Sequence, residues 1–467
     1  MNILRYSSLA LILIATGAAA YKLSHRPAPT LFQIPVVAQS NSAATMQTHF
    51  VSTQQNISTH AASLIELNDG RIRAFWFAGS REGAQDVDIQ SAVFDGKQWN
   101  AAQSVINREQ TQQALSRYVK KLGNPVSARA ADGSLWLYYV TVSLGGWAGS
   151  SITAMNSHDE GATWSAPHRL ITSPFINIST LIKGMPFAYS DGTIGLPVYH
   201  EFLGKFGELL HLSQNGEVLD KQRLSSGKLG IQPIVLVQND KQATVLMRHT
   251  GSPPKRVIAT QTDDAGQHWS APSKSTLANP DAAIAGVSLP DGRILVALNN
   301  LETGRNALSL LVSADGGITW PIIYQFEDQQ KNQSVSPDSF AQTNQQLAKQ
   351  TEATIVDANS YAQSAQRNKC VAQQCDFEFS YPYFIQTHSG DFHLVYTWNR
   401  SFIKHVQFSR AWLDEQMSQA KVTADKSPVR HREERSDVAI KKFPIIQLTG
   451  LPRFARNDVT SKYAELH

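Results

Sequence analysis

The sequence predicts an all-β fold, a six-bladed β-propeller, because two sequence motifs recur along its 467 residues. In the first motif a short turn, often Asp-Gly, separates two stretches of mostly apolar residues, which is the signature of a β-hairpin. Copies of this turn occur at Asn68-Asp69-Gly70, Asp132-Gly133, Asp191-Gly192, Asn239-Asp240, Asp291-Gly292 and Ser389-Gly390. Six hairpins, most of them about 50 residues apart, indicate four-stranded blades repeated around an axis.

The second motif is S-x-D-x-G-x-T-W, and it follows several of the hairpins. It is clearest at Ser157–Trp164 and Ser313–Trp320, it has His268 in place of Thr at Thr262–Trp269, and it is shortened at Asp95–Trp99. Its Asp is suited to accept backbone N–H groups, its Gly to adopt positive φ, and its Trp to pack the turn on its sheet. We therefore interpret these Asp residues as structural rather than catalytic.

The predicted propeller covers residues 49–419, and a strand near residues 49–53 is expected to close the ring by joining the last blade. An insertion at 327–375 separates blades five and six. It is rich in Gln, and we expect it to be helical around residues 342–351 and otherwise loop. Residues 420–467 form a basic tail without strand alternation, which we expect to be disordered and dispensable.

The N-terminus indicates export to the periplasm or the medium. Arg5 precedes an apolar stretch that ends in Ala18-Ala19-Ala20, so residues 1–21 read as a signal peptide or an N-terminal anchor. Residues 22–48 read as a linker. Membrane contact is expected only through such an anchor. The two cysteines, Cys370 and Cys375, are expected to form a local disulfide, as suits an exported protein.

Charge and motifs exclude several function classes. The chain has 42 basic and 38 acidic residues, and the excess lies in the tail, so the body is neutral and has no electrostatic footprint for nucleic acid. No phosphate-binding or dinucleotide-binding glycine motif, no Ser-His-Asp signature and no metal-ligand spacing occurs. We therefore expect no cofactor and no metal.

S-x-D-x-G-x-T-W is the Asp box, and the whole set of motifs resembles the BNR-repeat, sialidase-like family. The opening segment THAASLIELNDGRIRAFWFAGSREGAQDVDI, from Thr59, carries the resemblance most clearly. NPV at Asn124, IQP at Gln232 and FSYP at Phe379 extend it over most of the chain. The resemblance implies an exo-α-sialidase or related glycosidase that acts on a carboxylate-bearing glycan.

The resemblance also implies roles for individual residues. Sialidases use a Tyr nucleophile, and Arg forks hold the substrate carboxylate. Arg81, at the end of the first hairpin, is implied to help hold the carboxylate, and Asp86 is the implied acid/base, with Asp88 behind it. The carboxylate-binding arginines map to Arg248 or Arg256 and to Arg305, and His60 stands where the first Arg is expected.

The chain departs from the family at two further positions. Gln232 replaces the Glu that assists the nucleophile, and Phe379 occupies the expected nucleophile position. Tyr381 lies two residues on, which on a regular strand is the same face, so it is the substitute nucleophile or an aromatic wall.

Other polar residues are expected at the upper face of the propeller. His200 and Glu201 are a candidate acid/base pair, and Lys404 is a candidate substrate ligand. Lys183, Tyr199, Arg400 and His405 belong to the same group, and the sugar-stacking candidates are Trp76, Trp147 and Trp398.

Two other functions remain open from the sequence. The altered Gln232 and Phe379 favour a carbohydrate-binding propeller without turnover. His60, His200 and Tyr381 would suit a polysaccharide lyase that eliminates across uronic-acid glycans.

Overall fold

The computed structural model describes residues 12–14, 16–17, 30–38, 43–173, 177–225, 229–352 and 355–426. Most of the signal or anchor segment, and the tail beyond residue 426, lie outside these residues. None of the described helices is long and apolar enough to cross a membrane.

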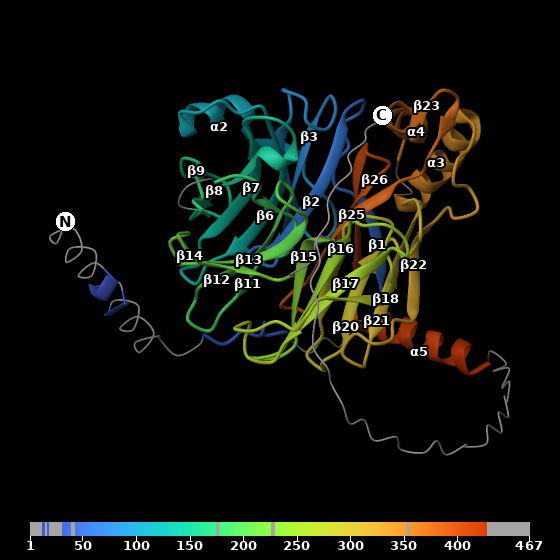
Figure 1. Cartoon of the computed structure of the whole chain (residues 1–467). Coiled ribbons are helices and arrows are strands. Elements are labelled where there is room, and N and C mark those ends of the chain that lie inside the picture. The colour runs from blue at the N-terminus through green and yellow to red at the C-terminus, as the bar shows by residue number, and fades with distance from the viewer. Residues whose placement is uncertain are drawn as a thin grey trace, which may run out of the picture. The chain divides into compact units, whose positions relative to one another are not determined.

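The sheets form six blades, as the repeats predict (Figure 1). Blade one consists of β2 (Ser58–Glu66), β3 (Ile72–Gly79), β4 (Asp88–Phe94) and β5 (Gln103–Asn107). Blade two consists of β6 (Lys121–Arg129), β7 (Leu135–Val142), β8 (Ser150–Ser157) and β9 (His168–Arg169). Blade three consists of β10 (Leu181–Ile182), β11 (Phe187–Ala188), β12 (Ile194–His200), β13 (Phe206–Leu212) and β14 (Val218–Arg223).

The remaining blades complete the ring. Blade four consists of β15 (Gly230–Val237), β16 (Ala243–His249), β17 (Arg256–Thr262) and β18 (Ser273–Ala278). Blade five consists of β19 (Ala285–Ser288), β20 (Ile294–Leu298), β21 (Ala307–Ser313) and β22 (Ile322–Asp328). Blade six consists of β25 (Phe379–Gln386), β26 (Phe392–Trp398), β27 (Phe402–Phe408) and β1 (Met46–Phe50), which pairs antiparallel with β27. The predicted closure by the N-terminal strand is confirmed.

Both repeated motifs lie in turns, as expected. Each Asp-Gly-type turn joins the first strand of a blade to the second, and each Asp-box turn joins the third to the fourth. In the box at Ser157–Trp164 the Asp159 carboxylate accepts from the Thr163 backbone N–H at 2.8 Å and from the Ser157 hydroxyl at 2.7 Å. Gly161 has φ +85°, a value that glycine adopts without strain.

The insertion between blades five and six contains two helices rather than one. α3 (Pro337–Thr351) matches the predicted helix, whereas α4 (Ala358–Lys369) falls where a loop was expected. A short hairpin of β23 (Cys370–Val371) and β24 (Gln374–Cys375) follows, and the expected disulfide joins its two cysteines. Tyr361 of α4 stacks on Phe402 of β27 with ring centroids 4.4 Å apart, so the insertion covers blade six.

The other helices lie outside the sheets. α2 (Arg108–Leu115) connects blade one to blade two, and α5 (Arg410–Lys426) follows β27. Figure 1 shows α2, α3 and α4 at one end of the blades and α5 at the opposite end. The α2, α3 and α4 end is also where the chain enters the first strand of each blade, and we call it the upper face.

The segment expected to be a linker is docked at its described part. Phe32 is 2% exposed and its ring centroid lies 5.6 Å from that of Tyr189, next to the blade-three turn. Its backbone N–H donates to the carbonyl of Asp240 at 2.9 Å, in the equivalent turn of blade four. This segment is therefore held on the face opposite the upper face.

Candidate active site

Every blade has a non-glycine residue with positive φ within the first four residues of its first strand or up to four residues before that strand. These residues are Ala61 (φ +54°), Asn124 (+43°), Ser179 (+59°), Gln232 (+51°), Asp281 (+65°) and Tyr381 (+54°). In β2, β6, β15 and β25 the strand register shifts at this residue, which marks a β-bulge. In three of these strands a proline, which has no N–H to give to the ladder, follows the bulged residue. Bulges re-aim side chains, so the upper face has a ring of six such positions, which we call the bulge ring.

Two members of the bulge ring meet across the propeller at the Tyr381 hydroxyl. This oxygen accepts hydrogen bonds from Arg248 Nη1 at 3.1 Å and from Gln232 Nε2 at 3.2 Å. Gln232 Oε1 accepts from the same Arg248 Nη1 at 3.1 Å, and Gln232 Nε2 also donates to the Tyr199 hydroxyl at 3.3 Å. A phenolic oxygen that accepts from a guanidinium and an amide is well placed to carry negative charge.

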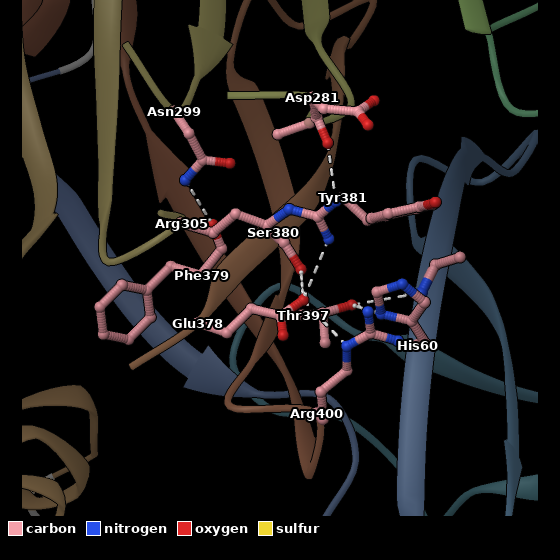
Figure 2. Close-up of polar contacts among 12 residues, drawn as sticks. His60, Asp281, Asn299, Arg305, Glu378, Phe379, Ser380, Tyr381, Thr397 and Arg400 are labelled. Carbon is pink, nitrogen blue, oxygen red and sulfur yellow. Dashed lines mark hydrogen bonds and ion pairs between the residues drawn. The ribbon is translucent and has the colours of Figure 1, made fainter. Parts of the chain in front are cut away.

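The bulge also explains why Tyr381 does not share the face of Phe379. Phe379 is fully buried in the hydrophobic core of blades five and six, whereas Tyr381 is half-buried at the site. The expectation of a common face is wrong because it assumed a regular strand, and the register shifts between Ser380 and Tyr383. Figure 2 shows the Phe379 ring directed away from Tyr381.

Arg248 is held by a third member of the bulge ring. Its Nε donates to the Asp281 carboxylate at 2.6 Å, and its side chain is 13% exposed. Burial alone would lower the pKa of Arg248, but the neighbouring Tyr381 and Asp281 raise it above its usual value. Arg248 is therefore a fixed cation beside the Tyr381 oxygen.

A buried carboxylate, Glu378, organises a second group of cations below Tyr381. Figure 2 shows Arg305 and Arg400 converging on it. Glu378 accepts from Arg400 Nε at 2.8 Å, Arg305 Nη1 at 3.3 Å and Lys369 Nζ at 2.8 Å. Burial would raise the pKa of Glu378, but Arg400, Lys369 and Arg305 hold it well below its usual value. Lys369 is the last residue of α4, so the insertion contributes directly to this cluster.

His60 lies in the site as a neutral group. Its ring centroid is 4.1 Å from that of Tyr381, and its Nδ1 is 2.9 Å from the Thr397 hydroxyl. Burial and the nearby Arg400 lower the pKa of His60 well below its usual value. His60 therefore does not supply the positive charge of the arginine whose place it takes.

Lys183 reaches across the propeller from blade three to blade six. Its Nζ donates to the carbonyl of Pro382 at 3.1 Å, and it lies 5.0 Å from the Tyr383 ring centroid and 5.9 Å from that of Tyr381. The residue is 3% exposed, and burial lowers the pKa of Lys183 to about 7. The bulge leaves the Pro382 carbonyl outside the ladder of strand hydrogen bonds, and Lys183 donates the hydrogen bond that this carbonyl would otherwise lack.

His200 and Glu201 have separate surroundings. His200 Nε2 accepts from the backbone N–H of Leu203 at 2.9 Å, and its ring stacks on Phe206, so it holds the β12–β13 loop in place. Burial raises the pKa of Glu201, while Lys205 and Arg248 act in the opposite direction. Glu201 therefore lies within electrostatic reach of Arg248.

The other predicted site residues are spread over the molecule. Asp86 is exposed in the β3–β4 loop of the upper face, and its carboxylate accepts from the Ser80 N–H and hydroxyl, both at 2.9 Å. Arg81 is exposed in the same loop. Arg256 pairs with Glu302 and not with Tyr381 or its partners. Lys404 is buried in an ion pair with Glu327 of β22 at 2.7 Å, away from the bulge ring.

Of the aromatic candidates, Trp147 alone is accessible. Trp76 and Trp398 are fully buried, so neither can stack on a sugar. Trp147 is half-buried in the β7–β8 loop, with Lys121 Nζ 3.8 Å from its ring centroid.

Sequence reasoning missed Asp281 and Glu378 altogether and gave no role to Asn124. The repeated X-Pro dipeptide in the first strands, at Asn124, Gln232 and Tyr381, is a signal that marks three of the bulge positions. Within the described part of the chain, no cluster of three or more His, Cys, Asp or Glu is arranged to hold a metal ion.

Comparisons with known proteins agree with this fold. The BNR repeat-like domain family model matches residues 70–394. No curated protein matches the chain. The "Hadza microbial sialidase Hz136" is 14% identical with a TM-score of 0.55, over 76% of this chain and 66% of its own. The NanB sialidase from Streptococcus pneumoniae is 11% identical with a TM-score of 0.52, over 84% and 72%. A protein of unknown function from Dyadobacter fermentans is 12% identical with a TM-score of 0.56, over 78% and 98%. At such identities the likeness concerns the fold.

Proposed function

Since the chain belongs to the family of BNR repeat-like domains, we propose that it is an exported, sialidase-like glycoside hydrolase. Its substrate is a glycan with a terminal carboxylate-bearing sugar, and Tyr381 is the nucleophile. Export is supported by the apolar N-terminal segment after Arg5 and by the Cys370–Cys375 disulfide.

The observation that carries the proposal is the pair of N–H donors on the Tyr381 oxygen. In the proposed reaction the Tyr381 hydroxyl loses its proton to water as its oxygen attacks the anomeric carbon, and the glycosyl–tyrosine bond forms while the bond to the leaving oxygen breaks. Water then cleaves the glycosyl–tyrosine bond and restores Tyr381. Arg248 and Gln232 stabilise the negative charge on the tyrosine oxygen at both stages.

Two carboxyl groups are candidates for the proton donor to the leaving oxygen. Asp86 corresponds to the loop acid that the family resemblance implies, and it lies exposed on the upper face. Glu201 is half-buried, and its raised pKa keeps it protonated to higher pH than an exposed Glu. Asp86→Asn and Glu201→Gln variants assign the role, because the true donor loses rate with substrates whose leaving group needs a proton.

The cations of the site suit a carboxylate substrate. Among the described residues, the Nη2 groups of Arg248 and Arg400 make no hydrogen bond with protein, so both can donate to an anion. Arg305, paired with Glu378, adds positive charge beside them. The structural neighbours named as sialidases support a sialoside as the first substrate to test.

The test is hydrolysis of a fluorogenic sialoside by the wild-type chain and by Tyr381→Phe. We expect turnover above a buffer blank in the wild type and a loss of about a thousandfold in the variant, with folding unchanged. Equal turnover by both proteins would contradict the role of Tyr381, and no turnover by the wild type would contradict the glycosidase.

One observation favours a second candidate, a carbohydrate-binding propeller without turnover. The Gln232 side chain donates to Tyr381 and cannot accept its proton, so no general base hydrogen-bonds the Tyr381 hydroxyl among the described residues. Titration calorimetry with free sialic acid, read together with the sialoside assay, separates the two functions, because only a binding protein without turnover gives heat of binding and leaves the sialoside intact.

A further inference from the structure

Asn124 occupies the blade-two position of the bulge ring. Its φ is +43°, and the register of β6 shifts between Gly123 and Val126, as β15 shifts around Gln232 and β25 around Tyr381. The Gln232 and Tyr381 side chains meet across the propeller at 3.2 Å. Because the blades repeat around one axis, the same bulge in blade two directs Asn124 toward the same centre.

Asn124 differs from the other polar members of the bulge ring in having no partner. The Ser179 hydroxyl accepts from the Glu201 N–H at 2.8 Å, Asp281 accepts from Arg248 at 2.6 Å, and Gln232 bonds Tyr381. Asn124 is 7% exposed, and its carboxamide makes no hydrogen bond among the described residues. Neither amide atom of Asn124 is among the fully buried side-chain atoms that lack a partner, so the carboxamide opens onto solvent and can bond a ligand.

An aromatic side chain lies against the strand at the residue before Asn124. A Cβ built on Gly123, the preceding residue, would lie 2.6 Å from the Trp147 ring, so this ring closes directly over the strand. Trp147 is half-buried, and Lys121 Nζ lies over its ring in a cation–π contact. An aromatic surface beside a few fixed polar groups is the usual lining of small-molecule sites.

We propose that Asn124 is a specificity-determining residue whose carboxamide hydrogen-bonds an uncharged hydroxyl or amide substituent of the bound sugar. The inference rests on the proposed function, because it needs a sugar in the centre of the propeller. A carboxamide offers both a donor and an acceptor, which matches hydroxyl and amide groups, whereas the carboxylate of the sugar goes to the arginines.

A structural role for Asn124 predicts a different result. Asn is enriched among residues with positive φ, so it could be present only to form the bulge. Glycine adopts this backbone without strain but has no carboxamide, so Asn124→Gly separates the two roles. Asn56→Gly is the matched control, because Asn56 also has positive φ (+61°) and makes no side-chain hydrogen bond among the described residues.

The experiment is titration calorimetry of the wild type and both variants with free sialic acid, together with binding to immobilised acidic and neutral glycans. We expect Asn124→Gly to bind about tenfold more weakly or worse and Asn56→Gly to bind like the wild type, at equal melting temperatures. Asn124→Asp keeps the shape and the backbone preference, but its charge opposes an anionic sugar, so it should lose at least as much affinity.

The outcomes distinguish this inference from the proposed function. Wild-type affinity in both Asn124→Gly and Asn124→Asp would overturn the inference and leave the glycosidase intact. Absence of any glycan bound by the wild type would overturn both. Loss of affinity in the Asn124 variants only would support the inference even if the preferred glycan proved to be neutral.

Discussion

At the scale of single residues, the partner of Tyr381 is an amide. Gln232 donates to the tyrosine oxygen and accepts from Arg248 at the same time. A glutamate at this position would instead accept the tyrosine proton and would form an ion pair with Arg248. The identity of residue 232 therefore decides whether the hydrogen-bond partners of the Tyr381 hydroxyl include a base or only donors.

We expect Gln232→Glu to increase turnover of a fluorogenic sialoside by about a hundredfold, because it supplies general-base assistance to the nucleophile. The rate of the variant should also fall at acidic pH as the new carboxylate is protonated. The measurement is kcat as a function of pH. Gln232→Leu is the control, and a decrease in kcat for both variants would show that the amide itself is required.

Lys183 gives a prediction for stability. The pKa of the buried amine is about 7 in the folded protein because of burial, against 10.5 for an ordinary lysine. Between these values the unfolded chain binds more protons, so the free energy of unfolding rises with pH through this window. We expect Lys183→Met to be more stable than the wild type at pH 7, with a difference that shrinks toward pH 10. Urea unfolding at pH 7 and pH 10 measures the difference in the free energy of unfolding between the two proteins. A difference that stays constant would show that Lys183 does not keep a lowered pKa in the folded protein.

The sequence singled out Tyr381, Gln232, Arg248 and Arg305 as site candidates, and the structure places these four side chains close together. It could not identify the Lys183–Pro382 contact, which joins residues 199 positions apart, or the Glu378 cluster, which depends on how the insertion packs against the two blades beside it. The sequence also predicted Lys404 at the site, whereas Lys404 faces blade five and pairs with Glu327. Strand alternation shows which residues share a face of a blade, but not whether that face meets the site or the next blade.

At the scale of elements, the insertion is an integral part of the core. Phe340 of α3 is fully buried with its ring centroid 4.6 Å from that of Phe377, and Lys369 of α4 reaches Glu378. The insertion therefore links the packing of blade six to the site.

We expect Phe340→Ala to lower the free energy of unfolding by about 3–5 kcal/mol, because it leaves a cavity in a packed core. Chemical denaturation measures the change. Gln363→Ala, at an exposed position of α4, is the control and should stay within about 0.5 kcal/mol of the wild type. A small effect at Phe340 would show that the insertion folds independently of the blades.

The two helices also show why one was predicted and the other was not. α3 has the apolar residues Phe340 and Ala348 on one face. The buried face of α4 consists of Ala358, Tyr361, Ala362, Ser364 and Ala365, which is nearly invisible to an apolar-periodicity test. The blades were predictable because their turns have local chemistry that repeats.

At the scale of the whole molecule, the ring closes by pairing its first strand with its last. β1 supplies the fourth strand of blade six, in register from Met46 opposite Phe408 to Phe50 opposite Lys404. An open ring would expose the edge of β27 and the core beneath Phe50.

A chain that begins at residue 51 should therefore melt at least about 10 °C below the full chain, whereas one that begins at residue 43 should retain β1 and most of the stability. Thermal unfolding by circular dichroism checks this. Equal melting of the two shortened chains would contradict closure by β1.

The proposed function requires the bulge ring to place the Tyr381 oxygen as a nucleophile at the centre of the propeller. The most direct test is to incubate the wild type with an activated fluorinated sialosyl fluoride, quench, digest and locate the added mass. We expect one sialosyl adduct, on the peptide that contains Tyr381, and none in Tyr381→Phe. Turnover of this compound with no adduct on Tyr381, or an adduct on another residue, would contradict it.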